Sequence, residues 1–350
     1  MGQFQRGQGV HFVGTIPLTD AEQVFRTTTE LLGDRLRRLP DGETTRSGWV
    51  ASQVPVLARH PDIVHVVVDV PGHGERPFFR PRPGLDAGTL DLGDIGYAGY
   101  ARDSYALFSR LRSDGVIPHG IRFQVNLPTP LAIASITAQL DVAPVIEAAY
   151  ERALLRELAQ ILETIPPSDL AVQWDIAIEL LMIEGVALTP PWFDDVWGGV
   201  LERIARLSAP VPEAIELGLH LCYGDFQHRR LVDLDDASVL VELANRLVGA
   251  IGRHVDFVHL PVRGDVDPAT YLAPLSGLRL EDNTELYLGL ITDDGGAEGA
   301  SARIAAARRH VETFGVATEC GMGRRPPEAV LPLLHVHRAV SAPVKLAQPR

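Results

Sequence analysis

Hydrophobic residues gather in short runs rich in Val, Ile, Leu and Phe, and longer stretches with helical spacing separate these runs. The pattern predicts eight strands, at residues 11–17, 35–41, 121–126, 170–175, 214–222, 255–262, 285–291 and 315–320. Between them, apolar positions recur three and four residues apart, as over residues 145–164 and 237–251. Eight strand–helix units predict an α/β protein, a single (β/α)₈ TIM barrel over residues 1–350.

One stretch does not fit this alternation. Residues 63–99 follow the second strand–helix unit, begin with a strand-like run at 63–70 and continue with many proline and glycine residues. Such residues favour turns over regular elements. We therefore expect residues 63–99 to be an insertion within the barrel, either a hairpin or a lid.

Composition narrows the class of partner. With 46% hydrophobic residues, the 350-residue chain can bury a large core. Its net charge of −13 argues against nucleic acid and against an anionic membrane surface as partners, because both would repel it. Small molecules are the expected partners, and a homo-oligomer is compatible with the sequence. The N-terminus does not resemble a signal peptide and no apolar run approaches about 20 residues, so a cytoplasmic protein is expected.

A histidine and a cysteine stand two residues apart at the end of the fifth predicted strand. Side chains alternate along a strand, so His220 and Cys222 project from the same face. The chain has one other cysteine, Cys320, which ends the eighth predicted strand. A barrel gathers the carboxyl ends of its strands at one end, where these three residues would share a site. A histidine nitrogen and two cysteine sulfurs suit zinc, so Zn²⁺ is the predicted cofactor.

Six short segments carry most of the remaining polar residues at predicted strand ends. They are Gly14-Thr15-Ile16-Pro17, Gly42-Glu43-Thr44-Thr45-Arg46, Leu127-Pro128-Thr129-Pro130, Gln173-Trp174-Asp175-Ile176-Ala177, His220-Leu221-Cys222-Tyr223 and Glu319-Cys320-Gly321-Met322. In this order they resemble motifs of the catalytic C-terminal barrel of cobalamin-independent methionine synthase. The resemblance covers nearly the whole chain and implies that fold.

The resemblance also implies roles for individual residues. His220, Cys222 and Cys320 would bind zinc and form the catalytic centre. Glu43 and Asp175 would hold the ammonium group of an amino acid substrate, and Thr15 would contribute to holding its carboxylate. Arg46 belongs to the same segment as Glu43 and is expected to contact the substrate as well.

The sequence also departs from the family. The family's fourth zinc ligand is a glutamate at the end of the sixth strand, where this chain has Pro261. His259 lies two residues earlier on the same strand face, which makes it the candidate fourth ligand on that strand, with water or substrate as alternatives. The family's pteridine-binding segment and its N-terminal duplicate barrel have no counterpart here, which argues against folate as the donor.

The predicted function is zinc-dependent alkyl transfer to a thiol. In its simplest form this is methyl transfer to homocysteine or a related thiol through a zinc-bound thiolate, with the thiol and an alkyl donor as the small-molecule partners. One alternative uses the same thiolate to open an epoxide, or in C–S bond formation or lysis, as in relatives that act on coenzyme M. Another is a non-catalytic barrel whose metal site has decayed.

Overall fold

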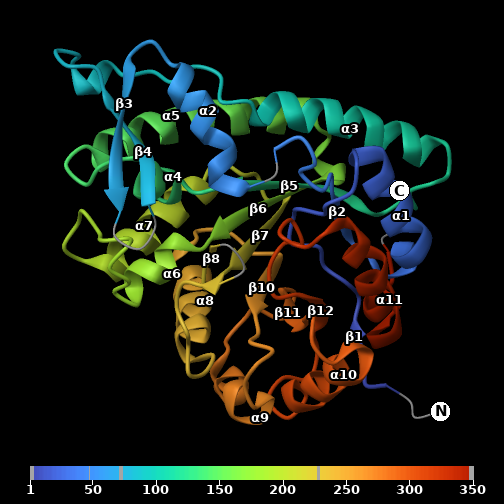
Figure 1. Ribbon diagram of the computed structural model, residues 1–350. Coiled ribbons are helices and arrows are strands. Elements are labelled where there is room, and N and C mark those ends of the chain that lie inside the picture. The colour runs from blue at the N-terminus through green and yellow to red at the C-terminus, as the bar shows by residue number, and fades with distance from the viewer. Residues whose placement is uncertain (1–3, 47, 71–73, 227–228, 347–350) are drawn as a thin grey trace.

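A parallel sheet curls through the centre of the molecule in the computed structural model, which describes residues 4–46, 48–70, 74–226 and 229–346 (Figure 1). All neighbouring pairs in this seven-stranded sheet are parallel. In order across the sheet, the strands are β12 (Gly315–Thr318), β11 (Glu285–Ile291), β10 (Phe257–Pro261), β7 (Glu216–Leu221), β6 (Leu170–Ile176), β5 (Arg122–Pro128) and β2 (Arg38–Pro40). The α/β class is confirmed, and these strands fall in seven of the eight predicted places.

The first predicted strand, at residues 11–17, is the exception. Val10 forms single parallel bridges to Leu36, just before β2, and to Val316 of β12, and His11 N–H donates to Val316 O over 3.0 Å. Beyond His11 the backbone bonds to loops, with Ile16 N–H donating to Gly42 O over 2.9 Å and Thr15 O accepting from Met322 N–H over 2.8 Å. Since these partners are not in strands, no eighth strand joins the sheet within the described residues. The N-terminal segment instead lies between the sheet's two edges.

Helices surround the outer side of the sheet (Figure 1). They are α1 (Ala21–Leu32), α2 (Val54–Arg59), α3 (Tyr97–Ser113), α4 (Pro130–Thr137), α5 (Ala143–Thr164), α6 (Ile178–Ile183), α7 (Val196–Ser208), α8 (Ser238–Ala250), α9 (Pro268–Tyr271), α10 (Gly296–Ala307) and α11 (Val330–Val340). Helix α1 illustrates why they form here: the Asp20 carboxylate caps it by accepting from Gln23 N–H over 2.8 Å. Its buried face includes Phe25, whose ring meets Phe108 of α3 edge-on at 5.5 Å. The described part of the chain contains no helix long and apolar enough to span a membrane.

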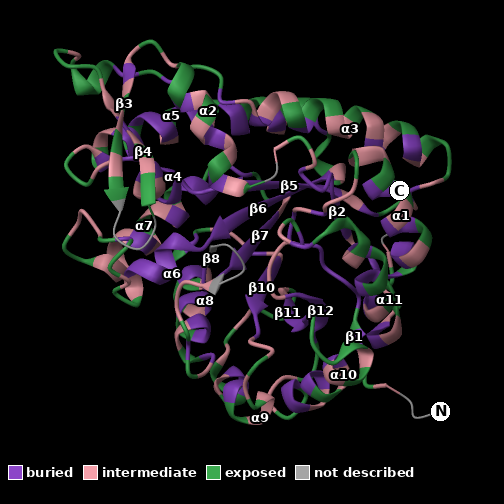
Figure 2. Cartoon of the chain, in the orientation of Figure 1, coloured by how far each residue is buried: buried purple, intermediate pink, exposed green. Residues whose placement is uncertain are grey.

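Residues 63–70 and 74–81 form a pair of strands outside the central sheet. Strands β3 (Ile63–Val70) and β4 (Gly74–Pro81) pair antiparallel and project beside α4, largely exposed or partly buried (Figure 2). Phe79 anchors β4, since it is buried and bridges to Ala138. The stretch predicted to be an insertion thus begins with an antiparallel strand pair, and the insertion and its lid function stay predictions. Two further pairs of short strands are β1 (Gly7–Gln8) with β13 (Ser341–Ala342), and β8 (Asp225–Phe226) with β9 (Arg229–Arg230).

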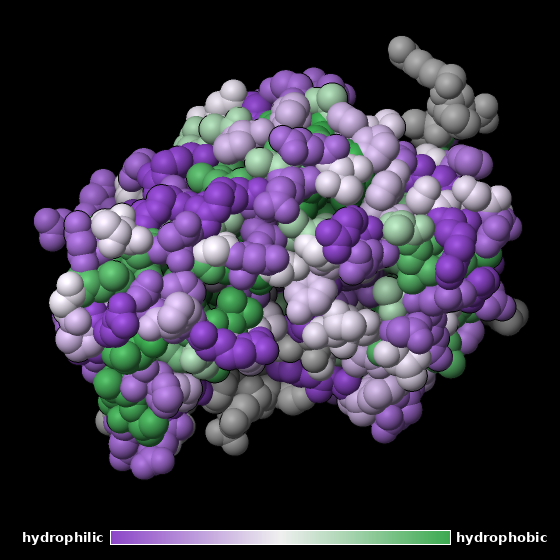
Figure 3. All heavy atoms as spheres, turned by 90° about the horizontal axis from the view of Figure 1, so that it is seen from above, coloured by the Kyte–Doolittle hydropathy of each residue, from purple (hydrophilic) through white to green (hydrophobic). Residues whose placement is uncertain are grey.

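Large and small residues alternate between neighbouring strands inside the curl of the sheet. Phe257 of β10 lies opposite Gly218 of β7, and a Cβ at Gly218 would come within 2.0 Å of the Phe257 ring. Tyr287 of β11 is placed in the same way against Gly315 of β12. These rings fill the interior below the carboxyl ends of the strands. The face of the molecule seen in Figure 3 is largely hydrophilic with hydrophobic residues interspersed, as expected for a chain with 22% charged residues.

Candidate metal centre

Three sulfur and nitrogen atoms meet at the carboxyl ends of two strands. His220 lies near the end of β7, Cys222 follows that strand directly, and Cys320 lies two residues beyond β12. The two Sγ atoms are 3.7 Å apart, and Cys320 Sγ is 3.9 Å from His220 Nε2. All three donor atoms lie within 4.8 Å of one another. The structure therefore brings together the three residues that the sequence singled out.

The spacing of these atoms matches a zinc site. A tetrahedral zinc with Zn–S bonds of about 2.3 Å and Zn–N bonds of about 2.0 Å separates two sulfurs by roughly 3.8 Å and a sulfur from a nitrogen by roughly 3.5 Å. The measured separations of 3.7 and 3.9 Å are close to these values. Two thiols and an imidazole also form a donor set that zinc prefers. His220, Cys222 and Cys320 could thus hold a metal ion.

The two cysteines affect each other's ionisation. Cys222 donates its S–H to Cys320, which lowers the pKa of Cys320 well below its ordinary value. The same hydrogen bond, reinforced by burial, raises the pKa of Cys222. The pair therefore gives up one proton readily and holds the second until a cation balances the charge.

His259 lies on the inward face of β10 but does not join the three donors. Its Nδ1 is 2.8 Å from His220 Nδ1 and its Nε2 is 3.0 Å from Thr318 O, so both ring nitrogens have partners. Burial lowers the pKa of His259 well below its usual range. Ligation of the metal by His259 therefore stays a prediction that these two contacts do not favour. Strand parity placed the ring on the correct face, but the ring is too deep along the strand and meets His220 before it meets the cysteines.

Asp175 links the donors to a second group of predicted residues. On neighbouring strands β6 and β7, Asp175 is the register partner of His220. Burial raises the pKa of Asp175 well above its usual range, and the nearby Glu43 carboxylate raises it further. Burial beside a second carboxylate favours the protonated form of Asp175 or a bound cation.

The loop after β2 holds Glu43 in a strained backbone conformation. Glu43 has φ of 53°, which is uncommon for a residue other than glycine. Asp41 stabilises this conformation by accepting from Glu43 N–H over 2.9 Å, and Thr15 Oγ1 donates to Glu43 Oε2 over 2.5 Å. Thr15 also lies against the loop after Cys320, since a Cβ at Gly323 would come within 2.5 Å of its methyl group. The structure thus places Thr15 and Glu43 together beside the cysteine loop.

Arg46 is paired with protein rather than aimed at the cluster. Its guanidinium donates two hydrogen bonds to Asp41, of 2.8 and 3.0 Å, and both side chains are buried. Ser104 Oγ donates to the same carboxylate over 2.7 Å. Arg46 therefore orients Asp41, which in turn holds the loop of Glu43. Its predicted contact with substrate stays a prediction that this pairing does not favour.

Buried amides connect the two carboxylates, and the sequence reading gave them no role of their own. Gln173 Nε2 donates to Asp175 Oδ1 over 2.8 Å, and His11 Nε2 donates to Gln173 Oε1 over 2.9 Å. On β5, Gln124 Nε2 donates to Asn126 Oδ1 over 2.8 Å, and Asn126 Nδ2 is 3.3 Å from Glu43 Oε1. The sequence does indicate these amides, because polar side chains at every second position of an apolar strand share one face, and here that face is the inward one.

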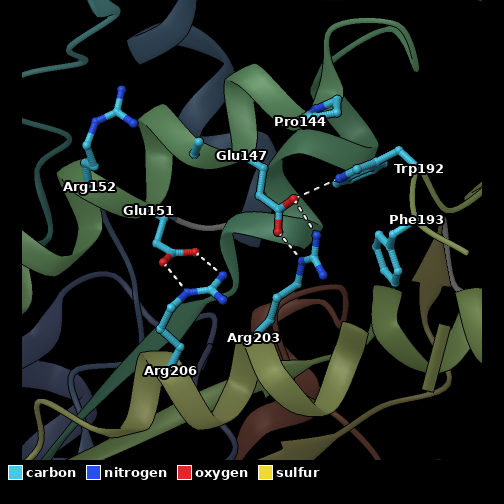
Figure 4. Close-up of a pocket in the computed structure, with 9 residues that line it drawn as sticks. Pro144, Glu147, Glu151, Arg152, Trp192, Phe193, Arg203 and Arg206 are labelled. Carbon is cyan, nitrogen blue, oxygen red and sulfur yellow. Dashed lines mark hydrogen bonds and ion pairs between the residues drawn. The ribbon is translucent and has the colours of Figure 1, made fainter. Parts of the chain in front are cut away.

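A surface pocket of about 520 Å³ lies apart from these residues, between α5 and α7. Four of its charged side chains form two ion pairs, Glu147 with Arg203 and Glu151 with Arg206 (Figure 4). Trp192 Nε1 also donates to Glu147. None of the predicted site residues lines this pocket, and these ion pairs neutralise most of its charge, so we do not place the chemistry there.

The fold and the His–Cys–Cys cluster define an α/β protein with a candidate metal centre at its strand ends. Similar solved structures are a B12-independent methionine synthase from Shewanella sp. W3-18-1 in complex with selenomethionine and a putative vitamin-B12 independent methionine synthase from Listeria monocytogenes. The Shewanella protein is 14% identical to this chain, with a TM-score of 0.63 over 95% of this chain and 97% of that one. The Listeria protein is also 14% identical, with a TM-score of 0.55 over 97% of both chains.

A methyltransferase from Methanosarcina mazei is also similar, with 12% identity and a TM-score of 0.55 over 95% of this chain and 93% of that one. No protein-family model and no curated protein sequence matches the chain. At these identities the likeness shows that the fold is shared.

Proposed function

We propose that the protein is a zinc-dependent transferase that alkylates a thiol, most simply a methyltransferase acting on an amino thiol such as homocysteine. The observation that carries the proposal is the meeting of His220, Cys222 and Cys320 at zinc-like distances. The fold shared with two methionine synthase structures and a methyltransferase supports it.

The chain's residues would divide the work between the metal and the substrate. His220, Cys222 and Cys320 would hold zinc, which supplies the positive charge that keeps a substrate thiol ionised and still nucleophilic near pH 7. Asp175, the register partner of His220, and Glu43 would bind the substrate ammonium and so aim its sulfur at the cluster. Thr15, which donates to Glu43, would keep that carboxylate in position.

In the reaction, the substrate sulfur attacks the alkyl carbon of the donor and an S–C bond forms. The bond from that carbon to the donor breaks, and its electron pair leaves with the donor. The thiol proton passes to solvent. The buried walls of the site, which include Gln173 and Asn126, favour a fixed orientation of the substrate over free tumbling in water.

The test compares homocysteine with 4-mercaptobutyrate, which lacks the amine, against a panel of methyl donors and an epoxide. Wild-type protein with zinc should alkylate homocysteine, and Cys222→Ser and Cys320→Ser should each abolish zinc binding and product. If the epoxide is the only donor that alkylates the thiol, the result would favour epoxide opening, the alternative chemistry for the same site. A wild-type protein that takes up no zinc would contradict the proposal.

Glu43→Gln distinguishes a specific loss of ammonium binding from a general loss of substrate binding. The variant keeps the shape and the hydrogen bond from Thr15 but loses the charge, so it should weaken homocysteine binding about 10–100-fold. Binding of 4-mercaptobutyrate should change little. Equal losses for both thiols would show that Glu43 does not contact the ammonium group.

A further inference from the structure

His220 and His259 face each other across two neighbouring strands. They are register partners on β7 and β10, and their Nδ1 atoms are 2.8 Å apart. His259 is fully buried, and His220 is nearly so. The other nitrogen of His220, Nε2, is the atom that lies 3.9 Å from Cys320 Sγ. The ring pair therefore connects the interior of the sheet to the cysteine cluster.

The partner of His259 Nε2 determines where the protons lie. That partner is Thr318 O, at 3.0 Å, and a carbonyl oxygen can only accept. His259 Nε2 must therefore carry a hydrogen. In a neutral imidazole the other nitrogen then accepts, so His259 Nδ1 accepts the hydrogen bond that joins the two rings.

It follows that His220 donates from Nδ1 and presents the bare lone pair of Nε2 to the cysteines. The opposite direction would require a charged His259, with a carbonyl and an imidazole as its only hydrogen-bond partners in the described structure. It would also place a proton on His220 Nε2, where a metal ligand needs a lone pair.

We propose that His259 is a positioning residue that fixes the tautomer and ring orientation of His220 for metal binding. The inference rests on the proposed metal site. In metal sites a ligating histidine commonly donates its other ring N–H to a protein acceptor. Here the acceptor is a neutral imidazole rather than a carboxylate, so it orients His220 without adding charge to the site.

Thr318 ties this ring pair to the third donor residue. Its carbonyl accepts from His259, and its Oγ1 donates to the backbone carbonyl of Cys320 over 2.6 Å. One residue at the end of β12 thus positions both the histidine pair and the cysteine loop. Since both nitrogens of His259 are used, the fourth position at the metal is left to the substrate thiol or to water.

The first test reads the tautomer directly in wild-type, metal-free protein. Long-range ¹H–¹⁵N NMR of the imidazoles should show the proton of His220 on Nδ1 and that of His259 on Nε2. This measurement needs no variant and no bound metal, so it holds even if the protein takes up no zinc and the proposed function fails. A His220 proton on Nε2 would overturn the inference.

The second test measures zinc affinity by competition with a chromophoric chelator. His259→Ala should weaken binding about 10–100-fold while keeping one zinc per chain. His259→Asn should recover most of this loss, because its Oδ1 can accept from His220 Nδ1. His337→Ala serves as control and should leave affinity unchanged, since the His337 ring is equally buried but its hydrogen bond goes to Leu333 O of its own helix. Wild-type affinity in His259→Ala, or no rescue by asparagine, would contradict the inference.

Discussion

Single buried polar residues in this protein depend on a small number of fixed hydrogen bonds. Glu43 keeps an unfavourable backbone conformation because Asp41 accepts its N–H, and Asp41 is itself held by Arg46 and Ser104. Such strain concentrates where function needs a side chain in one place. The role we infer for Arg46 is therefore to support Glu43 through Asp41.

Glu179 is a second buried carboxyl group, and its ionisation is coupled to folding. It is 0% exposed, Thr129 Oγ1 donates to its Oε1 over 2.5 Å, and no described group hydrogen bonds to its Oε2. Burial raises its pKa from 4.5 to about 7. Between these values the unfolded chain ionises while the folded protein stays protonated, so Glu179 lowers stability as pH rises.

Glu179→Gln should remove this pH dependence. In the wild type, Glu179 is protonated in both the folded and the unfolded state below pH 4.5, and ionised in both above pH 7. The free energy of unfolding of the wild type therefore falls by about 3 kcal/mol across this interval. Relative to wild type, the variant should gain about that much in free energy of unfolding between pH 4.5 and pH 8. Urea unfolding at several pH values measures the difference. A difference that does not vary with pH would show that Glu179 is ionised in the folded protein or already paired.

At the scale of strands, the packing of β7 against β10 sets the position of the histidine pair. Gly218 and Phe257 are register partners, and so are His220 and His259 two residues further on. The Phe257 ring occupies the space that a side chain at position 218 would need. The close contact between Gly218 and Phe257 therefore fixes the separation of His220 and His259.

Gly218→Ala should force these strands apart. A Cβ there would lie 2.0 Å from the Phe257 ring, so we expect a loss of about 1–3 kcal/mol in stability together with weaker zinc binding. Adding Phe257→Leu should restore part of both, because it removes the clash. Gly249→Ala on helix α8 is a matched control, as nothing lies within 4 Å of its Cβ position. It should stabilise slightly. Equal behaviour of the two alanine variants would refute the packing argument.

Sequence reasoning succeeded where one periodicity decided the element. Strand β11 has the predicted bounds of 285–291 because mostly apolar residues fill this stretch. The parity of His220 and Cys222 placed both at the cluster. Depth was harder: parity gives the face of His259 but not the ring it meets, which depends on the stagger between β7, β10 and β12. The pairing of Arg46 with Asp41 was not predicted, because the sequence does not distinguish Asp41 from any other loop carboxylate.

At the scale of the whole molecule, the two chain ends complete the structure around the sheet. Strand β1 pairs with β13, and Val10 bridges to Leu36 just before β2 and to Val316 of β12. The apolar pattern of residues 11–17 suggested a strand, yet their backbone groups bond to the loops that carry Gly42 and Met322. These are the loops next to Glu43 and Cys320. By bonding to these two loops, the irregular segment brings Thr15 to the site.

Zinc X-ray absorption with and without the substrate thiol tests the central claim most directly. Wild-type protein loaded with one zinc should show two sulfur neighbours at about 2.3 Å with nitrogen or oxygen completing the shell, and homocysteine should add a third sulfur. Cys320→Ser should hold little or no zinc. Unchanged coordination after homocysteine is added, or zinc retained by a Cys222→Ser/Cys320→Ser double variant, would contradict a thiol-binding metal centre at His220, Cys222 and Cys320.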